Sequence, residues 1–211
     1  MRSSILFFAL SCMSISLAHA ATPNKAGNQA SRAKFVRVVL PVYSQKVAFK
    51  MPANWKPAFT EDKHDVFVAE FMPGKEDRNT WTRMFSVQGF KNLSSRVNSE
   101  TFLNKLEANF KNTCGKDLVF EPLGATTIDS YKATGAILGC GKMPGRNWSE
   151  AGFYLAVQGE KDIFLIHKSF RADPFAPAKS PLNKATMADF MSDIVPIELC
   201  KGGGRRGVCQ K

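Results

Sequence analysis

The sequence predicts an α+β protein, with a mostly antiparallel β-sheet and two amphipathic helices packed on one face of it. One observation is that segments rich in β-branched and aromatic residues recur along the chain and alternate in polarity. Another is that two stretches change to a helical period, one after the middle of the strand series and one after its end. Short turns between neighbouring strands favour antiparallel pairing, and one sheet face is the obvious partner for both helices.

The strand segments follow one another with short connections. Residues 81–90 alternate clearly, and Gly159-Glu160-Lys161-Asp162 is typical of a hairpin turn between two apolar segments. Residues 55–59 lie among prolines and are expected to form a bend. The predicted strands are 35–40, 47–51, 65–72, 81–90, 118–121, 131–139, 151–158 and 163–170.

The first helix is predicted at 100–113, with Ser99 as its N-cap and Glu100 in its first turn. The second is predicted at 184–195, with Asn183 as its N-cap and Pro196 ending it. Each has one apolar stripe: Phe102, Leu103, Leu106 and Phe110 in the first, and Met187, Phe190, Met191 and Ile194 in the second.

The first twenty residues have the pattern of a secretory signal peptide. A short positive start with Arg2 precedes an apolar run, and Ala18-His19-Ala20 is an A-x-A cleavage site. Lipid attachment at Cys12 is the alternative, but the residues before it fit a lipobox poorly. The predicted organisation is therefore a signal peptide at 1–20, a flexible arm at 21–34, a single α+β domain at 35–200 and a basic tail at 201–211. This predicts a periplasmic protein.

Four cysteines remain after the leader, and an even number in an exported chain indicates disulfides. Pairing of neighbours gives Cys114–Cys140 and Cys200–Cys209, one of three possible connectivities. A zinc site is the competing interpretation, but the paired C-x₂₋₄-C spacing of such sites does not occur. We expect no bound metal and no cofactor.

The residues that carry chemistry do not form a known catalytic pattern. The sequence has no H-E-x-x-H, G-x-S-x-G or G-x-x-x-x-G-K-[ST] motif. His64 lies in a charged turn and His167 within a predicted strand, so each is expected to be structural rather than a general base. These observations favour a protein that is not an enzyme, although a hydrolase with an unrecognised site stays open.

Candidate binding residues come from the loop at 142–150 and from the tail. Trp148 stands beside Arg146 between two predicted strands, and aromatic residues with arginine are favoured at protein contacts. The alternative is that Trp148 folds back over the edge of the core. In the tail, Arg205 and Arg206 concentrate positive charge between Cys200 and Cys209. The formal net charge is +11, which suits an acidic protein, anionic envelope polymers or lipid headgroups. Export and the absence of a recognisable motif argue against nucleic acid.

One segment supports a resemblance. Met51-Pro52-Ala53-Asn54-Trp55 ends an early strand, and further strands, a helix, more strands and a terminal helix follow. This order and the P-x-x-W motif resemble the PsbP/DcrB-like group of exported bacterial proteins over about residues 45–197. The resemblance implies a binding or accessory role and carries no catalytic residues. The strand at 35–40 and the cysteine-closed tail depart from the pattern.

The leading hypothesis is an exported periplasmic protein with a non-enzymatic binding or accessory role in the cell envelope, with another envelope protein as its partner. Loops and a sheet edge would make the contact. The alternatives are a periplasmic immunity-type inhibitor of a secreted toxin and an envelope hydrolase.

Overall fold

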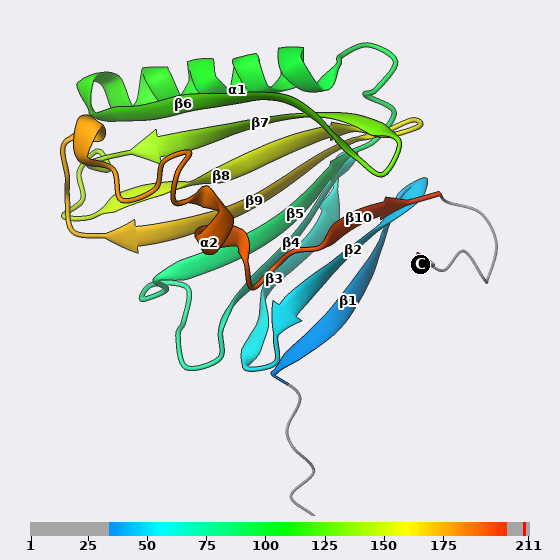
Figure 1. Cartoon of the computed structure of the whole chain (residues 1–211), viewed down its shortest axis with the longest axis horizontal. Coiled ribbons are helices and arrows are strands. Elements are labelled where there is room, and N and C mark those ends of the chain that lie inside the picture. Colours follow the sequence, from blue (N-terminus) through cyan, green and yellow to red (C-terminus); the bar gives the residue numbers. More distant parts are fainter. Residues whose placement is uncertain (1–33, 202–208, 210–211) are drawn as a thin grey trace, which may run out of the picture. The chain divides into compact units, whose positions relative to one another are not determined.

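Within residues 34–201 and 209, which the computed structural model of the protein describes, the strands pair into two antiparallel sheets. The larger has seven strands in the spatial order β3-β4-β5-β9-β8-β7-β6 (Figure 1). The smaller has three, in the order β1-β2-β10. The predicted class, an α+β protein with a mostly antiparallel sheet, is confirmed.

The bounds of the elements follow the predicted segments closely in most places. The larger sheet contains β3 (Trp55–Lys63), β4 (Val66–Pro73), β5 (Arg83–Phe90), β6 (Leu118–Ile128), β7 (Tyr131–Cys140), β8 (Ser149–Gln158) and β9 (Ile163–Ala172). The smaller contains β1 (Phe35–Val42), β2 (Gln45–Pro52) and β10 (Ile197–Cys200), and the helices are α1 (Ser99–Cys114) and α2 (Met187–Met191). Two short 3₁₀ turns are Gly115–Asp117 and Pro177–Lys179.

The two helices lie on opposite faces of the larger sheet, so their predicted placement on one face is wrong. Alternation along β8 explains this, because Tyr154 and Ala156 pack under α1, whereas Phe153 and Leu155 belong to the other core. Met191 of α2 packs in the same core as Phe153 and Leu155, on the face opposite α1. The central strands are apolar on both faces, and each face therefore needs its own cover.

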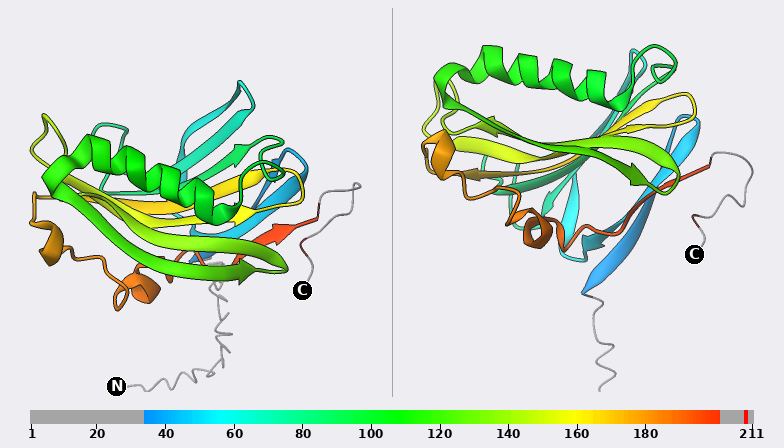
Figure 2. Two further views of the ribbon diagram at one scale, coloured as in Figure 1. Left: turned by 90° about the horizontal axis from the view of Figure 1, so that it is seen from above. Right: turned by 45° about the horizontal axis from the view of Figure 1, so that its top comes forward.

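The main core fills the space between the two sheets. Phe49 of β2 contacts Phe71 and Phe85 of the larger sheet, with ring centroids 5.6 and 4.6 Å apart. Figure 2 shows the resulting layers, with α1 on one side of the larger sheet and β1, β2 and β10 on the other. The smaller sheet thus covers part of the face of the larger sheet that lies opposite α1.

Two local predictions about strands are corrected by the structure. Residues 55–59 belong to β3, an edge strand, where Pro57 costs no ladder hydrogen bond and the register shifts before Phe59. Strand β6 runs on to Ile128, past a second irregularity between Pro122 and Gly124. Gly124 has a φ of +84°, and this interruption of the pattern hid the rest of the strand.

The helix ends also differ from prediction. Asn98 rather than Ser99 caps α1, because its side chain accepts the N–H of Thr101 at 2.7 Å. The hydroxyl of Ser99 faces the sheet and bonds to that of Thr134. The second helix is shorter than the predicted 184–195, since the Asn183 side chain accepts two backbone N–H groups and holds the first residues in a turn.

Both predicted disulfide pairings are present. Cys114 and Cys140 join the end of α1 to the end of β7, with Cα atoms 5.3 Å apart. Cys200 and Cys209 join the end of β10 to the tail, with Cα atoms 5.2 Å apart. The predicted signal peptide and arm up to residue 33, and the tail residues 202–208, 210 and 211, lie outside the described part of the chain.

Candidate functional site

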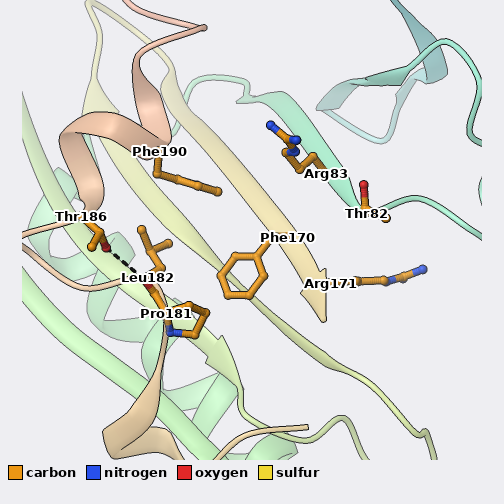
Figure 3. Close-up of a pocket in the computed structure, with 8 residues that line it drawn as sticks. All are labelled: Thr82, Arg83, Phe170, Arg171, Pro181, Leu182, Thr186 and Phe190. Atoms are coloured by element: carbon orange, nitrogen blue, oxygen red, sulfur yellow. Dashed lines mark hydrogen bonds between the residues drawn. The ribbon is translucent and has the colours of Figure 1, made fainter. Parts of the chain in front are cut away.

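An apolar pocket with arginines at its border lies where β5 begins and β9 ends. Its volume is about 380 Å³, within the usual range for ligand sites. Figure 3 shows the aromatic and aliphatic side chains converging on one side and the arginines on the other. We call this the Arg83 pocket; its lining residues are Thr82, Arg83, Phe170, Arg171, Pro181, Leu182, Thr186 and Phe190.

Strand register decides which side chains reach this pocket. Arg83 is the register partner of Phe170, so both side chains lie on the α2 face of the sheet. Phe190 of α2 closes this side against Phe170, with ring centroids 6.0 Å apart. Thr186 donates its hydroxyl to the carbonyl of Pro181 at 3.0 Å and fixes the loop that forms the remaining wall (Figure 3).

Arg171 comes next to Phe170 in the strand and therefore turns to the opposite face. Its guanidinium carbon lies 3.8 Å from the ring centre of Trp81 and 5.2 Å from that of Trp148. Arg146 lies 5.2 Å from the Trp148 ring as well. Arg146, Trp148, Arg171 and Trp81 thus form a run of cation–π contacts, which we call the arginine–tryptophan stack.

The charges of the two arginines nearest the pocket are balanced differently. Arg171 donates to the Glu150 carboxylate at 3.0 Å. The side chain of Arg83 is exposed and makes no ion pair or hydrogen bond within residues 34–201 and 209. Burial lowers the pKa of nearby Lys168, Asp193 opposes that change, and the positive charge of Arg83 adds to the lowering. The α2 side of the site therefore carries an uncompensated positive charge.

The predicted pair Arg146 and Trp148 is in contact and forms one end of the stack. Trp148 is half-buried, and its indole N–H is enclosed without an acceptor in the described part of the chain. The ring therefore packs on the protein through Arg171 while it still borders the surface through Arg146. Arg205 and Arg206 lie outside the described residues.

Sequence reasoning missed Arg83, Arg171 and Trp81 as site residues. Arg83 and Arg171 stand near the ends of two predicted strands that are far apart in the chain, and only the pairing of β5 with β9 brings them together. Trp81 precedes β5 and packs with Met72 and Met84. An arginine at the end of an apolar strand was the available signal, but it occurs too often to select a site.

Neither histidine belongs to this site. His64 has a φ of +53° in the turn between β3 and β4. His167 stacks on Tyr154, with ring centroids 4.7 Å apart, and its ring nitrogens lie within 3.4 Å of Gln88 and 3.2 Å of Ser169. Burial lowers the pKa of His167 to about 4, which leaves the ring neutral at pH 7.

Glu198, Cys200 and Cys209 bring three potential ligand atoms within 4.8 Å of one another. Both sulfurs are in the Cys200–Cys209 disulfide and so do not provide the thiolates that zinc takes from cysteine. Across the described residues, neither α1 nor α2 has the length and apolarity needed to span a bilayer.

No protein-family model matches the sequence, and no curated protein matches it. Among solved structures, the chain is similar to the Ran-binding protein Mog1p of Saccharomyces cerevisiae, with 11% identity and a TM-score of 0.43. That similarity covers 77% of this chain and 86% of Mog1p. A protein of unknown function from Pseudomonas aeruginosa, PA94, has 12% identity and a TM-score of 0.40, covering 76% of this chain and 96% of the other. Similarities of this size carry no argument about function.

Proposed function

We propose that this chain is an exported, non-enzymatic binding protein of the cell envelope, which holds a partner at the Arg83 pocket and the neighbouring arginine–tryptophan stack. One observation carries the proposal: the uncompensated guanidinium of Arg83 lies beside a preformed apolar pocket. A partner that presents a carboxylate next to an apolar side chain would satisfy both parts at once.

The composition of the surface supports a protein partner. Tryptophan and arginine are the residues most enriched among those that dominate binding energy, and they cluster in desolvated patches. The stack supplies two of each on the opposite face of the sheet, and its Arg171 also borders the pocket. The residues that line the pocket offer cations, hydroxyls and apolar surface, which are groups for recognition rather than for proton transfer.

Placement in the periplasm is supported by the signal-peptide pattern of residues 1–20 and by the two disulfides. Disulfides of this kind persist in oxidising compartments and are rare in the cytosol. An accessory role, in which the protein steadies or delivers another envelope component, agrees with both the compartment and the site.

The proposal can be tested by photo-crosslinking in the periplasm of the native host. A photo-reactive amino acid replaces Arg146 in one strain and Asn104, on the exposed side of α1, in a matched control. We expect a discrete adduct from position 146 that is absent from position 104 and reduced by a second change, Trp148→Ala. Equal adducts from both positions, or none from either, would contradict the proposal.

The identity of the adduct separates the two binding roles. A stable envelope component supports the accessory role. If the adduct is instead a protein that is toxic when produced alone in the periplasm, the inhibitor role replaces the accessory role.

A further inference from the structure

The outer edge of β1, which no other described strand pairs with, is a second candidate surface. Three of its side chains are exposed apolar groups: Phe35, Val36 and Val39, at 39%, 40% and 41% exposure. Natural edge strands are usually protected by charges, bulges or a covering segment. The one charged side chain of β1, Arg37, lies on the outward face, where it reaches across β2 to Glu198 with an ion pair of 2.8 Å and donates to the Cys209 carbonyl at 3.2 Å. Side-chain charge therefore protects this edge poorly.

The hydrogen bonding of β2 shows which backbone groups β1 leaves open. The N–H of Lys50 donates to the carbonyl of Ile194, on the side away from β1. Its register partner, Arg37, therefore turns its own N–H and C=O away from β2. The same alternation gives Phe35 and Val39 outward backbone groups. Within the described residues, β1 has β2 as its sole strand partner.

The charge of the smaller sheet selects the kind of strand that would fit there. Its three strands contain Arg37, Lys46 and Lys50 and one carboxylate, Glu198. Lys34 lies just before β1 and is exposed. Lys50 is also placed over the Phe35 ring, at 4.5 Å, so positive charge lies directly on the outward face beside β1.

We propose that the β1 edge takes an extended segment of a partner protein in which acidic and apolar residues alternate. The segment would add as a strand and bond to the outward backbone groups of Arg37 and Val39. Its acidic side chains would lie on the outward face beside Arg37 and Lys50, and its apolar side chains would continue the row of Val36 and Val38. This surface is separate from the Arg83 pocket and does not depend on it.

The test uses hydrogen exchange of individual backbone amides, followed by NMR, in the mature protein with both disulfides. The probe is a synthetic peptide of alternating valine and glutamate, acetylated and amidated at its ends. One control peptide has lysine for every glutamate, and another has N-methyl groups on alternate amides. We expect the acidic peptide to slow exchange at Arg37 and Val39, an effect that salt weakens, and both controls to leave exchange unchanged.

Two substitutions sharpen the result. Val39→Pro removes an outward donor where an edge strand tolerates proline, and it should abolish the effect at Arg37 while the thermal midpoint stays close to that of the parent. Lys50→Glu keeps every backbone group and should weaken the effect of the acidic peptide, because it removes most of the positive charge of the smaller sheet. Trp148→Ala should leave the peptide effect intact, which separates this surface from the proposed binding site.

Several results would overturn the proposal. One is slow exchange at Arg37 and Val39 in the free, dilute protein, which would mean that the chain covers its own edge. Another is protection that grows with protein concentration alone, which would identify a second copy as the occupant. Equal protection by the acidic and lysine peptides, or by neither, would equally contradict it.

Discussion

Arg83 and Arg171 show how a single position in a strand determines what a side chain offers. The two residues flank the same stretch of the β5–β9 pair, yet they point to opposite faces of the sheet. Arg171 pairs with Glu150 and contacts two indole rings, whereas the Arg83 guanidinium has no ion pair in the described part of the chain and is the group that we propose meets a partner's carboxylate. The neighbours of each arginine thus decide whether its charge is already balanced within the protein.

His167 provides a test at the residue scale, because burial alone lowers its pKa from 6.5 to about 4. The unfolded chain takes up a proton near pH 6.5, which the native ring resists. Above about pH 6.5 the ring is neutral in both states, so its burial does not reduce the free energy of unfolding. As the pH falls from 6.5 towards 4, protonation of the unfolded chain lowers the free energy of unfolding. An NMR titration of the ring protons should give a midpoint near 4 in the native protein and near 6.5 in urea. His64→Gln assigns the resonances, and a native midpoint near 6.5 would contradict the burial of this ring.

At the scale of elements, a buried cation helps to hold α2 on the sheet. Lys168 of β9 is 2% exposed and reaches Asp193 and the carbonyl of Phe190. Its ammonium group also lies 4.6 Å from the Phe190 ring centre. These contacts help to attach the short helix to the sheet and to position Phe190, which lines the Arg83 pocket.

Removal of the carboxylate should therefore destabilise the protein strongly. Asp193→Ala leaves the Lys168 cation buried without a counter-charge, and we expect a loss of about 3 kcal/mol in the free energy of unfolding. Asp189→Ala, on an exposed side of the same helix, is the control and should change it by less than about 0.5 kcal/mol. Urea denaturation measures both; similar losses in the two variants would show that the pair does not anchor α2.

The sequence predicted most elements but not how they are layered. The strong alternation at 81–90 and the long apolar runs at 151–158 and 163–170 identified β5, β8 and β9, and neighbour pairing gave both disulfides. The opposite placement of the helices could have been suspected from strands that are apolar on both faces. Strand β10 is only four residues long and pairs with β2 across most of the chain, which no local pattern reveals.

The candidate site was predictable only in part for the same reason. Arg146 and Trp148 lie two residues apart, so their contact follows from local sequence. Arg83, Phe170 and Phe190 come from three distant segments, and their meeting depends on sheet register and on the placement of α2. Local patterns carry no information about that meeting.

At the scale of the whole molecule, the proposed function requires that the protein be exported. The mature protein should begin at Ala21 and contain no free thiol, since two disulfides use all four remaining cysteines. Intact-mass measurement of the periplasmic fraction, before and after reduction and alkylation, checks both points. Ala18→Leu is the control and should retain the leader by disrupting the A-x-A site. A chain that keeps Met1, or one found with reduced cysteines, would contradict this account.

The most direct test of the proposed function is the dissociation constant of the cross-linked partner for the mature protein and its variants. Trp148→Ala and Arg83→Gln should each weaken binding by about 1–4 kcal/mol, the range of residues that dominate an interface. Asn104→Ala should leave the dissociation constant unchanged. Unchanged affinity in Trp148→Ala and Arg83→Gln, with their thermal midpoints intact, would show that the partner does not bind at the Arg83 pocket or at the arginine–tryptophan stack.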